Sequence, residues 1–348
     1  IDEAQPPQCA ALLHPFLMGE PFDTLSGAGV ALEVSRALGT ANERQIVLAG
    51  IAAIGDVMAM LKETRAIVRQ CIAILNEKKV RCIQLLANDS SPWDETKIAF
   101  QVVPKLNVTG RLADKANANN TVRYLLSDNG ALLMNMAAQI SDLNTLRKTM
   151  SEQMSQTALE KADRSRAFLV ICDPSFHEGI VGLVAGKLCE QLGKPCMVLA
   201  EKGAQCRGSI RAPKGMDLST FFDGLDCLSE YGGHAQAAGI GFAMIDLPKV
   251  MRYVEQKMRE TPLQEQPEQA AIAVSEDMLT LREVSSLDAL RPFGNGFEEP
   301  LFCIAHPQIV DSRTLSNDKH MKWRTASGME LLYFNPGTRM QELKNGDF

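Results

Sequence analysis

Glycine and histidine occur together at two places in the second half of the chain, and both places could bind an anion. The first is the segment Tyr231–Gly239, in which Gly232 and Gly233 come directly before His234 and three alanines follow. We expect a loop here, because glycines lack the Cβ atom that would hold a ligand away from the backbone. A glycine turn whose histidine only caps the backbone is an equally good interpretation of these residues.

The second place is the segment Ser175–Gly182, which contains His177 and Gly179. It lies between an apolar run, residues 168–172, and a helical pattern, residues 180–192. A strand that leads through a glycine-containing turn into a helix leaves N–H groups unpaired at the helix N-terminus, where a phosphate can bind. The two glycine segments together therefore favour a phosphate ligand more than either does alone.

Between these segments, residues 207–212 have the composition of a β-strand. Ser209 and Arg211 are two positions apart on it, so they are expected to share one face. A hydroxyl and a guanidinium side by side suit the oxygens of a phosphate. An exposed edge strand with an ordinary surface arginine is the alternative.

These three motifs, in this order and spacing, resemble the DHH-associated domain of the DHH phosphoesterase superfamily and, more narrowly, the RecJ exonucleases. The resemblance implies a single-strand-specific exonuclease that degrades DNA from the 5′ end with two divalent ions, Mn²⁺ or Mg²⁺. It implies catalytic roles near the scissile bond for His177 and His234. It also implies a phosphate-binding set composed of His177, Gly179, Ser209, Arg211, Gly232, Gly233 and His234.

Two aspartates in the first part of the chain are candidate metal ligands. Asp56 ends an apolar run that begins at Ile46, and a buried carboxylate there would be costly unless it met a cation or a hydrogen bond. A helix cap is the simpler explanation. The run resembles the family's Gly-Thr-Ile-Ala-Asp-Val motif, which implies that Asp56 binds metal. Asp2 matches the aspartate of the family's Asp-His-His motif, but Glu3 stands where a histidine is expected, so we expect an incomplete catalytic domain.

A further segment, residues 104–112, resembles the family's Pro-Arg-x-Asn-Ala-x-Gly-Arg-Leu motif, with Lys105 in place of the first arginine. Gly110 would permit a tight bend that presents Arg111. By this resemblance Asn107 and Arg111 would bind phosphate, and Arg111 would join Ser209 and Arg211 at the 5′ end of the strand. An ordinary surface arginine is again the alternative.

The elements that would position these residues predict an α/β protein: two α/β lobes joined by a long helix, followed by a small OB-like β-barrel. Apolar residues at spacings of three and four from Leu132 to Leu159 indicate the long helix, capped near Ser127 or Asp128. The expected domains are 1–126 (part of the DHH catalytic domain), 127–165 (connector helix), 166–262 (DHH-associated domain) and 263–348 (OB-like domain). In the third we expect strands at 168–172, 196–200, 207–212 and 239–243 and helices at 180–192, 218–229 and 247–259.

The barrel is expected from short strand-like runs between Ala270 and Phe334. Before them, the segment Arg291–Pro300 resembles the RecJ family's Pro-Phe-Gly-x-Gly-Asn-Pro-x-Pro signature, from which Phe297 and Glu298 depart. The shorter DHH phosphatases and oligoribonucleases end before such a barrel, so these residues favour the RecJ branch. A barrel of this type could bind single strands by stacking bases on aromatic side chains.

Composition sets wider limits on function. The formal net charge of −6 argues against a protein that coats nucleic acid, but it does not exclude a local basic groove. The nine cysteines form no CxxC pair and are typical of buried thiols in a reducing compartment, and no apolar run is long enough for a membrane span. We therefore expect a cytoplasmic protein whose partners are 5′-phosphorylated single-stranded DNA and, by the resemblance, a helicase and a single-strand-binding protein.

Two other functions remain open at this point. A relative that kept the fold and lost the metal centre would be a nucleic-acid-binding scaffold in replication or repair. The missing histidines after Asp2 favour it, whereas Asp56 and the glycine segments favour the enzyme. A small-nucleotide phosphatase or oligoribonuclease is the third candidate, which the expected barrel disfavours.

Overall fold

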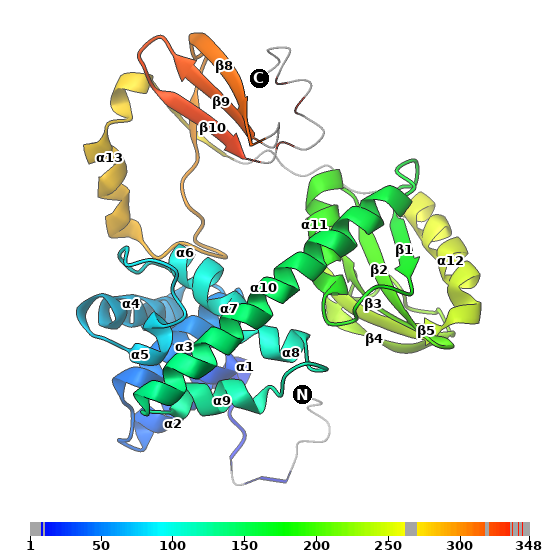
Figure 1. Cartoon of the computed structure of the whole chain (residues 1–348), viewed down its shortest axis with the longest axis horizontal. Helices are drawn as coiled ribbons and strands as arrows, with labels where there is room; N and C mark the ends of the chain where they lie inside the picture. Colours follow the sequence, from blue (N-terminus) through cyan, green and yellow to red (C-terminus); the bar gives the residue numbers. More distant parts are fainter. Residues whose placement is uncertain are drawn as a thin grey trace. The chain divides into compact units, whose positions relative to one another are not determined.

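The computed structural model describes residues 8–9, 11–261, 270–316, 320–334, 336, 340 and 343. The chain divides into two compact units, each described by itself below. The first unit is Ile1–Asn144 with Asp277–Cys303, and the second is Thr145–Glu276 with Ile304–Phe348. Helices and sheets are both present, as expected for an α/β protein (Figure 1). No helix within the described ranges is long and apolar enough to cross a membrane.

The first unit is helical over its described residues before position 127, although we expected an α/β lobe there. Asp2 lies outside the described residues. The helices of the first unit before position 127 are α1 (Pro15–Met18), α2 (Gly27–Ala37), α3 (Glu43–Gly55), α4 (Lys62–Glu77), α5 (Arg81–Gln84), α6 (Glu95–Lys97), the π-helix η1 (Ile98–Val102), α7 (Val103–Leu106), α8 (Val108–Arg111) and α9 (Asn119–Leu126).

Helix α3 begins with a capping box, in which the side chain of Asn42 accepts from the N–H of Gln45 and the side chain of Gln45 accepts from the N–H of Asn42. Such a box satisfies two backbone donors that a helix start leaves unpaired. The apolar face of α3 then packs on α2 and α4, where Leu32, Ala49 and Ile67 are buried together. These contacts position the end of α3, where Asp56 lies.

The long helix predicted from the apolar spacing is confirmed as α10 (Gly130–Lys161). It contains 32 residues, which corresponds to about 48 Å at 1.5 Å per residue. Its first turn is capped by Asn129, whose Oδ1 accepts from the N–H of Leu132 at 3.0 Å, next to the expected Ser127 or Asp128. The boundary between the two units falls within this helix.

The second unit contains a five-stranded sheet in the order β1-β2-β3-β5-β4. Strands β1 and β2 are parallel, and every other neighbouring pair in this sheet is antiparallel. The strands are β1 (Leu169–Asp173), β2 (Cys196–Lys202), β3 (Gln205–Arg211), β4 (Leu228–His234) and β5 (Ala237–Ala243). The helices are α11 (Val181–Leu192), α12 (Leu247–Glu260) and the short η2 (Met244–Asp246). Four predicted strands and two predicted helices of this domain are thereby confirmed.

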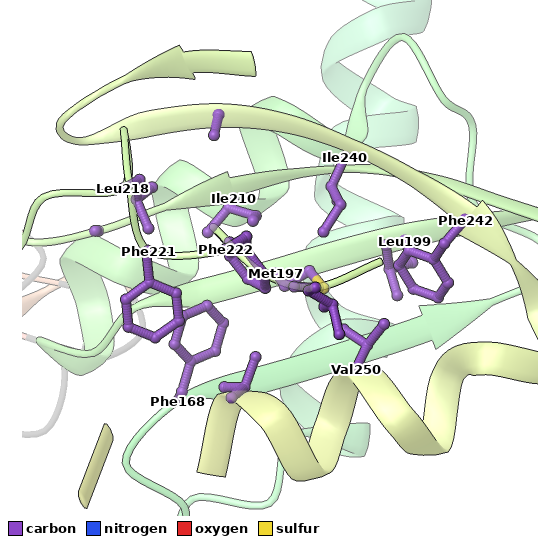
Figure 2. Close-up of a cluster of buried hydrophobic side chains, with 14 of the residues drawn as sticks. Phe168, Met197, Leu199, Ile210, Leu218, Phe221, Phe222, Ile240, Phe242 and Val250 are labelled. Atoms are coloured by element: carbon purple, nitrogen blue, oxygen red, sulfur yellow. The ribbon is translucent and has the colours of Figure 1, made fainter. Parts of the chain in front are cut away.

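The two faces of this sheet are covered differently. The face that carries Ile210 and Ile240 packs on α12 through Val250 and forms the main hydrophobic core. Figure 2 shows these side chains converging with Phe168, Met197, Leu199, Leu218, Phe221, Phe222 and Phe242. Helix α11 packs on the other face, over β2 and β3. Polar residues can reach a ligand only on that second face, because the first is filled with apolar side chains.

Two predictions for this domain are wrong. Residues 218–229 form turns and the start of β4 instead of a helix, because Phe221 and Phe222 insert into the core and Gly224 has a φ of 87° that helices do not adopt. The segment Tyr231–Gly239 is a β-hairpin instead of a loop, since β4 and β5 pair through it. The glycines are therefore held in a regular sheet.

The C-terminal part contains a three-stranded antiparallel sheet in the order β10-β9-β8, with Met321, Trp323 and Leu343 buried together. A separate two-stranded sheet pairs residues 272–274 with residues 302–304. The second unit also contains β6 (Ile272–Val274), β8 (Ile309–Leu315), β9 (His320–Thr325) and β10 (Glu330–Phe334), whereas α13 (Leu281–Ser286) and η4 (Leu287–Leu290) belong to the first unit. The short η3 (Glu276–Met278) and β7 (Phe302–Ile304) lie at the boundaries between the units.

Candidate nucleic-acid interface

Small residues are paired with one another across three neighbouring strands of the sheet in the second unit. Ser209 on β3 pairs with Gly239 on β5, which pairs with Gly232 on β4. Directly paired residues of neighbouring strands point to the same face. A Cβ atom at Gly232 would meet no atom within 4 Å, and one at Gly239 would meet only the carbonyl oxygen of Gly232 at 3.8 Å. The backbone is therefore exposed here, and any side chain would fill the space above it.

The neighbouring row of paired residues carries Arg211 and His234. Arg211 pairs with Ala237, which pairs with His234, and His234 is exposed. Nη1 of Arg211 donates to Oγ of Ser209 at 2.6 Å, so the hydroxyl and the guanidinium lie together as their spacing predicts. We call the surface formed by Ser209, Arg211, Gly232, His234 and Gly239 the glycine groove.

Helix α11 begins beside the glycine groove. A Cβ atom at Gly182 would lie 3.3 Å from both Nη2 of Arg211 and Oγ of Ser209, so glycine lets the first turn of the helix approach them closely. The N-terminus of a helix attracts anions through its unpaired N–H groups and its dipole. Sequence reasoning placed Gly182 in the motif but did not assign it this role, because the contact depends on β3.

His177 and Gly179 form the turn that leads into α11. Nδ1 of His177 accepts from the N–H of Gly179 at 3.1 Å, and the carbonyl oxygen of His177 accepts from the N–H groups of Ile180 and Val181 at 2.9 Å and 3.2 Å. These bonds show His177 shaping the start of the helix. Its catalytic role, like that of His234, stays a prediction.

Asp173 supports the same turn from the end of β1. Its buried carboxylate accepts from the backbone N–H of Ser175 at 2.8 Å and from the hydroxyl of Ser175 at 2.5 Å, and Lys161 donates to its other oxygen. The hydrogen bond from Lys161, together with those from Ser175, lowers the pKa of Asp173 to about 2. Sequence reasoning missed this residue, although its place two positions before a serine at a strand end is typical of an Asx turn.

Gly233 does not face the glycine groove. A Cβ atom there would lie 2.2 Å from the carbonyl oxygen of Ala237 and 2.5 Å from Cα of Ala238. Gly233 is therefore required for the close approach of the two hairpin strands. Its predicted role in binding phosphate finds no support in this position, in contrast to its neighbour Gly232.

A cavity of about 660 Å³ continues the glycine groove along the sheet, away from Arg211. Two ion pairs lie at it: Arg207 with Glu230 at 2.7 Å, and Lys202 with Glu178 at 2.9 Å. The hydrogen bond from Lys202 lowers the pKa of Glu178. The lining residues are Glu178, Arg207, Gly208, Ser229, Glu230, Tyr231, Gly232, Gly239 and Ile240.

Asn107 and Arg111 lie in the first unit, at the ends of the short helix α8. Gly110 is inside this helix and has no positive φ, so the expected tight bend is wrong. Burial lowers the pKa of the Arg111 guanidinium, and no other cause contributes to this shift. A partly desolvated cation of this kind suits an anionic ligand. That Arg111 joins Ser209 and Arg211 stays a prediction.

Lys105, which replaces an arginine of the family motif, has a structural position. Its side chain is buried, and Nζ donates to the carbonyl oxygen of Leu86 at 2.7 Å and to Oδ1 of Asn88 at 2.8 Å. These contacts attach α7 to the loop that follows α5. Lys105 is therefore held in the interior of the first unit.

Asp56 follows the last residue of α3 and is exposed, so the argument that its burial is costly does not apply. The turn after it is unusual, because Val57 has a φ of 53° that β-branched residues rarely adopt. Asn295 holds this turn through its side chain and its backbone. The side-chain Nδ2 donates to the carbonyl oxygen of Val57 at 3.3 Å, and the backbone carbonyl oxygen of Asn295 accepts from the N–H of Met60 at 2.7 Å. The glycine-rich segment that resembles the RecJ signature thus fixes the turn beside Asp56.

The described residues do not assemble a metal centre. No group of three or more His, Cys, Asp or Glu side chains is placed within them to hold an ion. Asp56 therefore belongs to no such group among the described residues, and Asp2 lies outside them. A two-ion site needs more ligands than Asp56 supplies.

Two protein families match the chain. Residues 165–260 match the DHHA1 domain, and residues 271–348 match the RecJ OB domain. The first match covers the glycine groove and the whole five-stranded sheet. The second covers the C-terminal strands, whose OB type is thereby confirmed.

Curated relatives agree with these matches. The single-stranded-DNA-specific exonuclease RecJ of Bacillus subtilis (strain 168) is 27% identical over 366 residues, which cover 98% of this chain and 45% of that protein. RecJ of Thermus thermophilus is 27% identical over 342 residues, which cover 95% of this chain and 49% of that protein. The chain thus spans about half the length of these relatives.

Solved structures give the same result. The crystal structure of RecJ from Thermus thermophilus in complex with Mg²⁺ matches with a TM-score of 0.81 and 26% identity, over 93% of this chain and 52% of that one. A crystal structure of exonuclease RecJ bound to manganese matches with a TM-score of 0.60 and 27% identity, over 72% of this chain and 65% of that one. The chain is therefore RecJ-like, with a DHHA1 domain followed by a RecJ OB domain.

Proposed function

We propose that the protein is a single-stranded-DNA-specific exonuclease that removes nucleotides from the 5′ end, and that the glycine groove holds the strand by its phosphates. The observation that carries this proposal is the row of Ser209, Gly239 and Gly232 beside the Arg211 guanidinium. Bare backbone gives a phosphate room, and the guanidinium and hydroxyl supply charge-assisted hydrogen bonds. The relatives named as RecJ exonucleases support the same activity.

Within this proposal the described residues bind and position the strand. Arg211 and Ser209 hold the 5′ phosphate, the first turn of α11 adds its dipole, and Arg111 contributes from the first unit. His234 lies in the row of Arg211 and contacts the next phosphate. Hydrolysis adds water across a P–O bond of the backbone, and divalent ions such as the Mg²⁺ and manganese of the RecJ structures would activate that water. Asp56 and Asp2 are proposed ligands within a larger set.

The test is the release of nucleotides from labelled single-stranded DNA with a 5′ phosphate in the presence of Mn²⁺. We expect the protein to release mononucleotides and to leave duplex DNA intact. Replacing Arg211 with alanine removes a charge-assisted contact worth about 1.5–3 kcal/mol, so kcat/KM should fall roughly 10- to 150-fold. Unchanged kinetics for Arg211→Ala would exclude Arg211 from the binding site.

A nucleic-acid-binding scaffold is the alternative, and the similarity to proteins named as RecJ exonucleases does not favour it. Such a protein would bind the same strand through the glycine groove and release no nucleotide at any Mn²⁺ concentration. A small-nucleotide phosphatase is disfavoured by the RecJ OB domain at residues 271–348. Turnover of a nucleoside bisphosphate without turnover of single-stranded DNA would favour it.

The finer points of the proposal concern the setting of the protein. We propose that it acts in DNA repair or recombination in the cytoplasm, where its buried thiols stay reduced. A helicase that supplies single strands and a single-strand-binding protein are the proposed partners. Co-purification of tagged protein with either partner, resistant to nuclease treatment, would support this part.

A further inference from the structure

A second arginine lies on the same face of β3 as the phosphate-binding pair. Arg207 is two positions from Ser209 and four from Arg211, and residues at such spacings on a strand share one face. In its row across the sheet, Arg207 pairs with Gly241, which pairs with Glu230. Because glycine has no side chain, the guanidinium of Arg207 reaches over it and meets Oε1 of Glu230 at 2.7 Å.

This ion pair is exposed to solvent and to the cavity. The side chains of Arg207 and Glu230 are 54% and 59% exposed, and pairs at such positions contribute little to stability. Both residues line the cavity of about 660 Å³ that also includes Gly232 and Gly239 of the glycine groove. An anion that extends along the groove therefore reaches a guanidinium whose present partner is easily displaced.

We propose that Arg207 is a second phosphate-binding residue and that Glu230 is its intramolecular competitor, which the strand must displace. This inference rests on the proposed function and adds a second contact to the same site. At about 3.3 Å per residue, Arg207 and Arg211 are separated by roughly 13 Å along β3. A strand held at Arg211 by its 5′ phosphate presents a later phosphate to Arg207, whereas a mononucleotide has one phosphate and cannot reach both.

Glu230 competes with the DNA strand for the guanidinium of Arg207. With the strand absent, the carboxylate neutralises Arg207 and lowers the positive potential of the cavity. With the strand bound, the exposed carboxylate of Glu230 turns towards water. The guanidinium of Arg207 then binds a phosphate of the strand through two N–H groups. Glu178, the other carboxylate at this cavity, remains paired with Lys202 at 2.9 Å.

The test is the equilibrium affinity of the purified protein for a 5′-phosphorylated oligothymidylate of roughly a dozen nucleotides, measured in EDTA to prevent hydrolysis. We expect Arg207→Gln to weaken binding roughly 10-fold and to lower the slope of log K against log salt by about 0.7, the contribution of one phosphate. Thymidine 5′-monophosphate should bind both proteins equally. Glu230→Gln should tighten oligothymidylate binding about 2- to 5-fold.

The matched control is Lys249→Gln. This substitution breaks the exposed ion pair between Lys249, which lies on α12, and Asp226. Helix α12 covers the opposite face of the sheet. Lys249→Gln should change neither affinity nor salt slope. If Arg207→Gln behaves like this control while Arg211→Ala loses affinity, the inference is wrong and the proposed function stands. If the wild-type protein binds no oligothymidylate, or Arg211→Ala binds it normally, the proposed function itself fails.

Discussion

At the scale of single residues, neighbouring glycines have different roles. Gly232 and Gly239 have open space where a side chain would be, whereas Gly233 is in contact with the opposite strand. The sequence alone cannot distinguish them, because the difference depends on which face of β4 each residue occupies. The pairing of Ser209 with Arg211 was predictable, since a two-residue spacing on a strand depends on no other element.

Two substitutions separate these roles. In Gly239→Val the side chain projects into the glycine groove, so we expect affinity for single-stranded DNA to fall at least about 10-fold with little change in the melting temperature. In Gly233→Ala the new Cβ clashes with the backbone at Ala237, so we expect the free energy of unfolding to fall by about 1–3 kcal/mol. Thermal melts and binding titrations of both variants check this. Equal loss of stability in both would contradict the assignment of Gly239 to an open groove.

At the scale of elements, short turns position the site as much as strands and helices do. The Asp173 carboxylate organises the turn before α11, and Asn295 holds the turn after α3. Helices α10, α11 and α12 were predictable from their apolar spacing. The hairpin β4–β5 was not, because its glycines are typical of loops and only pairing with distant β3 makes them a strand.

The Asp173 turn predicts a pH-dependent contribution to stability. The pKa of Asp173 is lowered to about 2, so its contribution is complete above the ordinary pKa of about 4 and is lost as the pH falls through 2. Asp173→Asn keeps an acceptor for Ser175 but loses the charge that Lys161 meets, and should cost about 1 kcal/mol of unfolding free energy at pH 7. Urea unfolding at several pH values should show this difference shrinking between pH 4 and 2.

Asp217 offers a matched control, because it makes the same turn with Ser219 at 2.8 Å and 2.6 Å but is exposed. Asp217→Asn should change stability less than Asp173→Asn does. A pH-independent difference between wild type and Asp173→Asn would show that the charge of Asp173 contributes nothing.

The turn after α3 contains a residue whose replacement with glycine should increase the stability of the protein. Val57 is 66% exposed and has a φ of 53°, so glycine at this position relieves backbone strain and loses little packing. We expect Val57→Gly to raise the free energy of unfolding by roughly 0.5–1 kcal/mol. The same substitution at Val34, inside helix α2, should lower it by a similar amount. Chemical denaturation of both variants measures the two signs, and a loss at Val57 would refute the strain.

At the scale of the whole molecule, function depends on local arrangement more than on overall charge. The chain has a net charge of −6, yet Arg211, His234 and the start of α11 gather on one face of a sheet. The family was predictable because several motifs occur together in order. The contribution of Arg111, which lies in the other unit, was proposed from resemblance, since sequence spacing says nothing about how separate units meet.

The most direct test of the account is a crystal structure of the protein with a short 5′-phosphorylated oligonucleotide. We predict that the terminal phosphate lies within hydrogen-bond distance of Ser209 Oγ and the Arg211 guanidinium, with the backbone of the strand over Gly239 and Gly232. A terminal phosphate bound on the α12 face of the sheet, or on the C-terminal strands with the glycine groove empty, would contradict it.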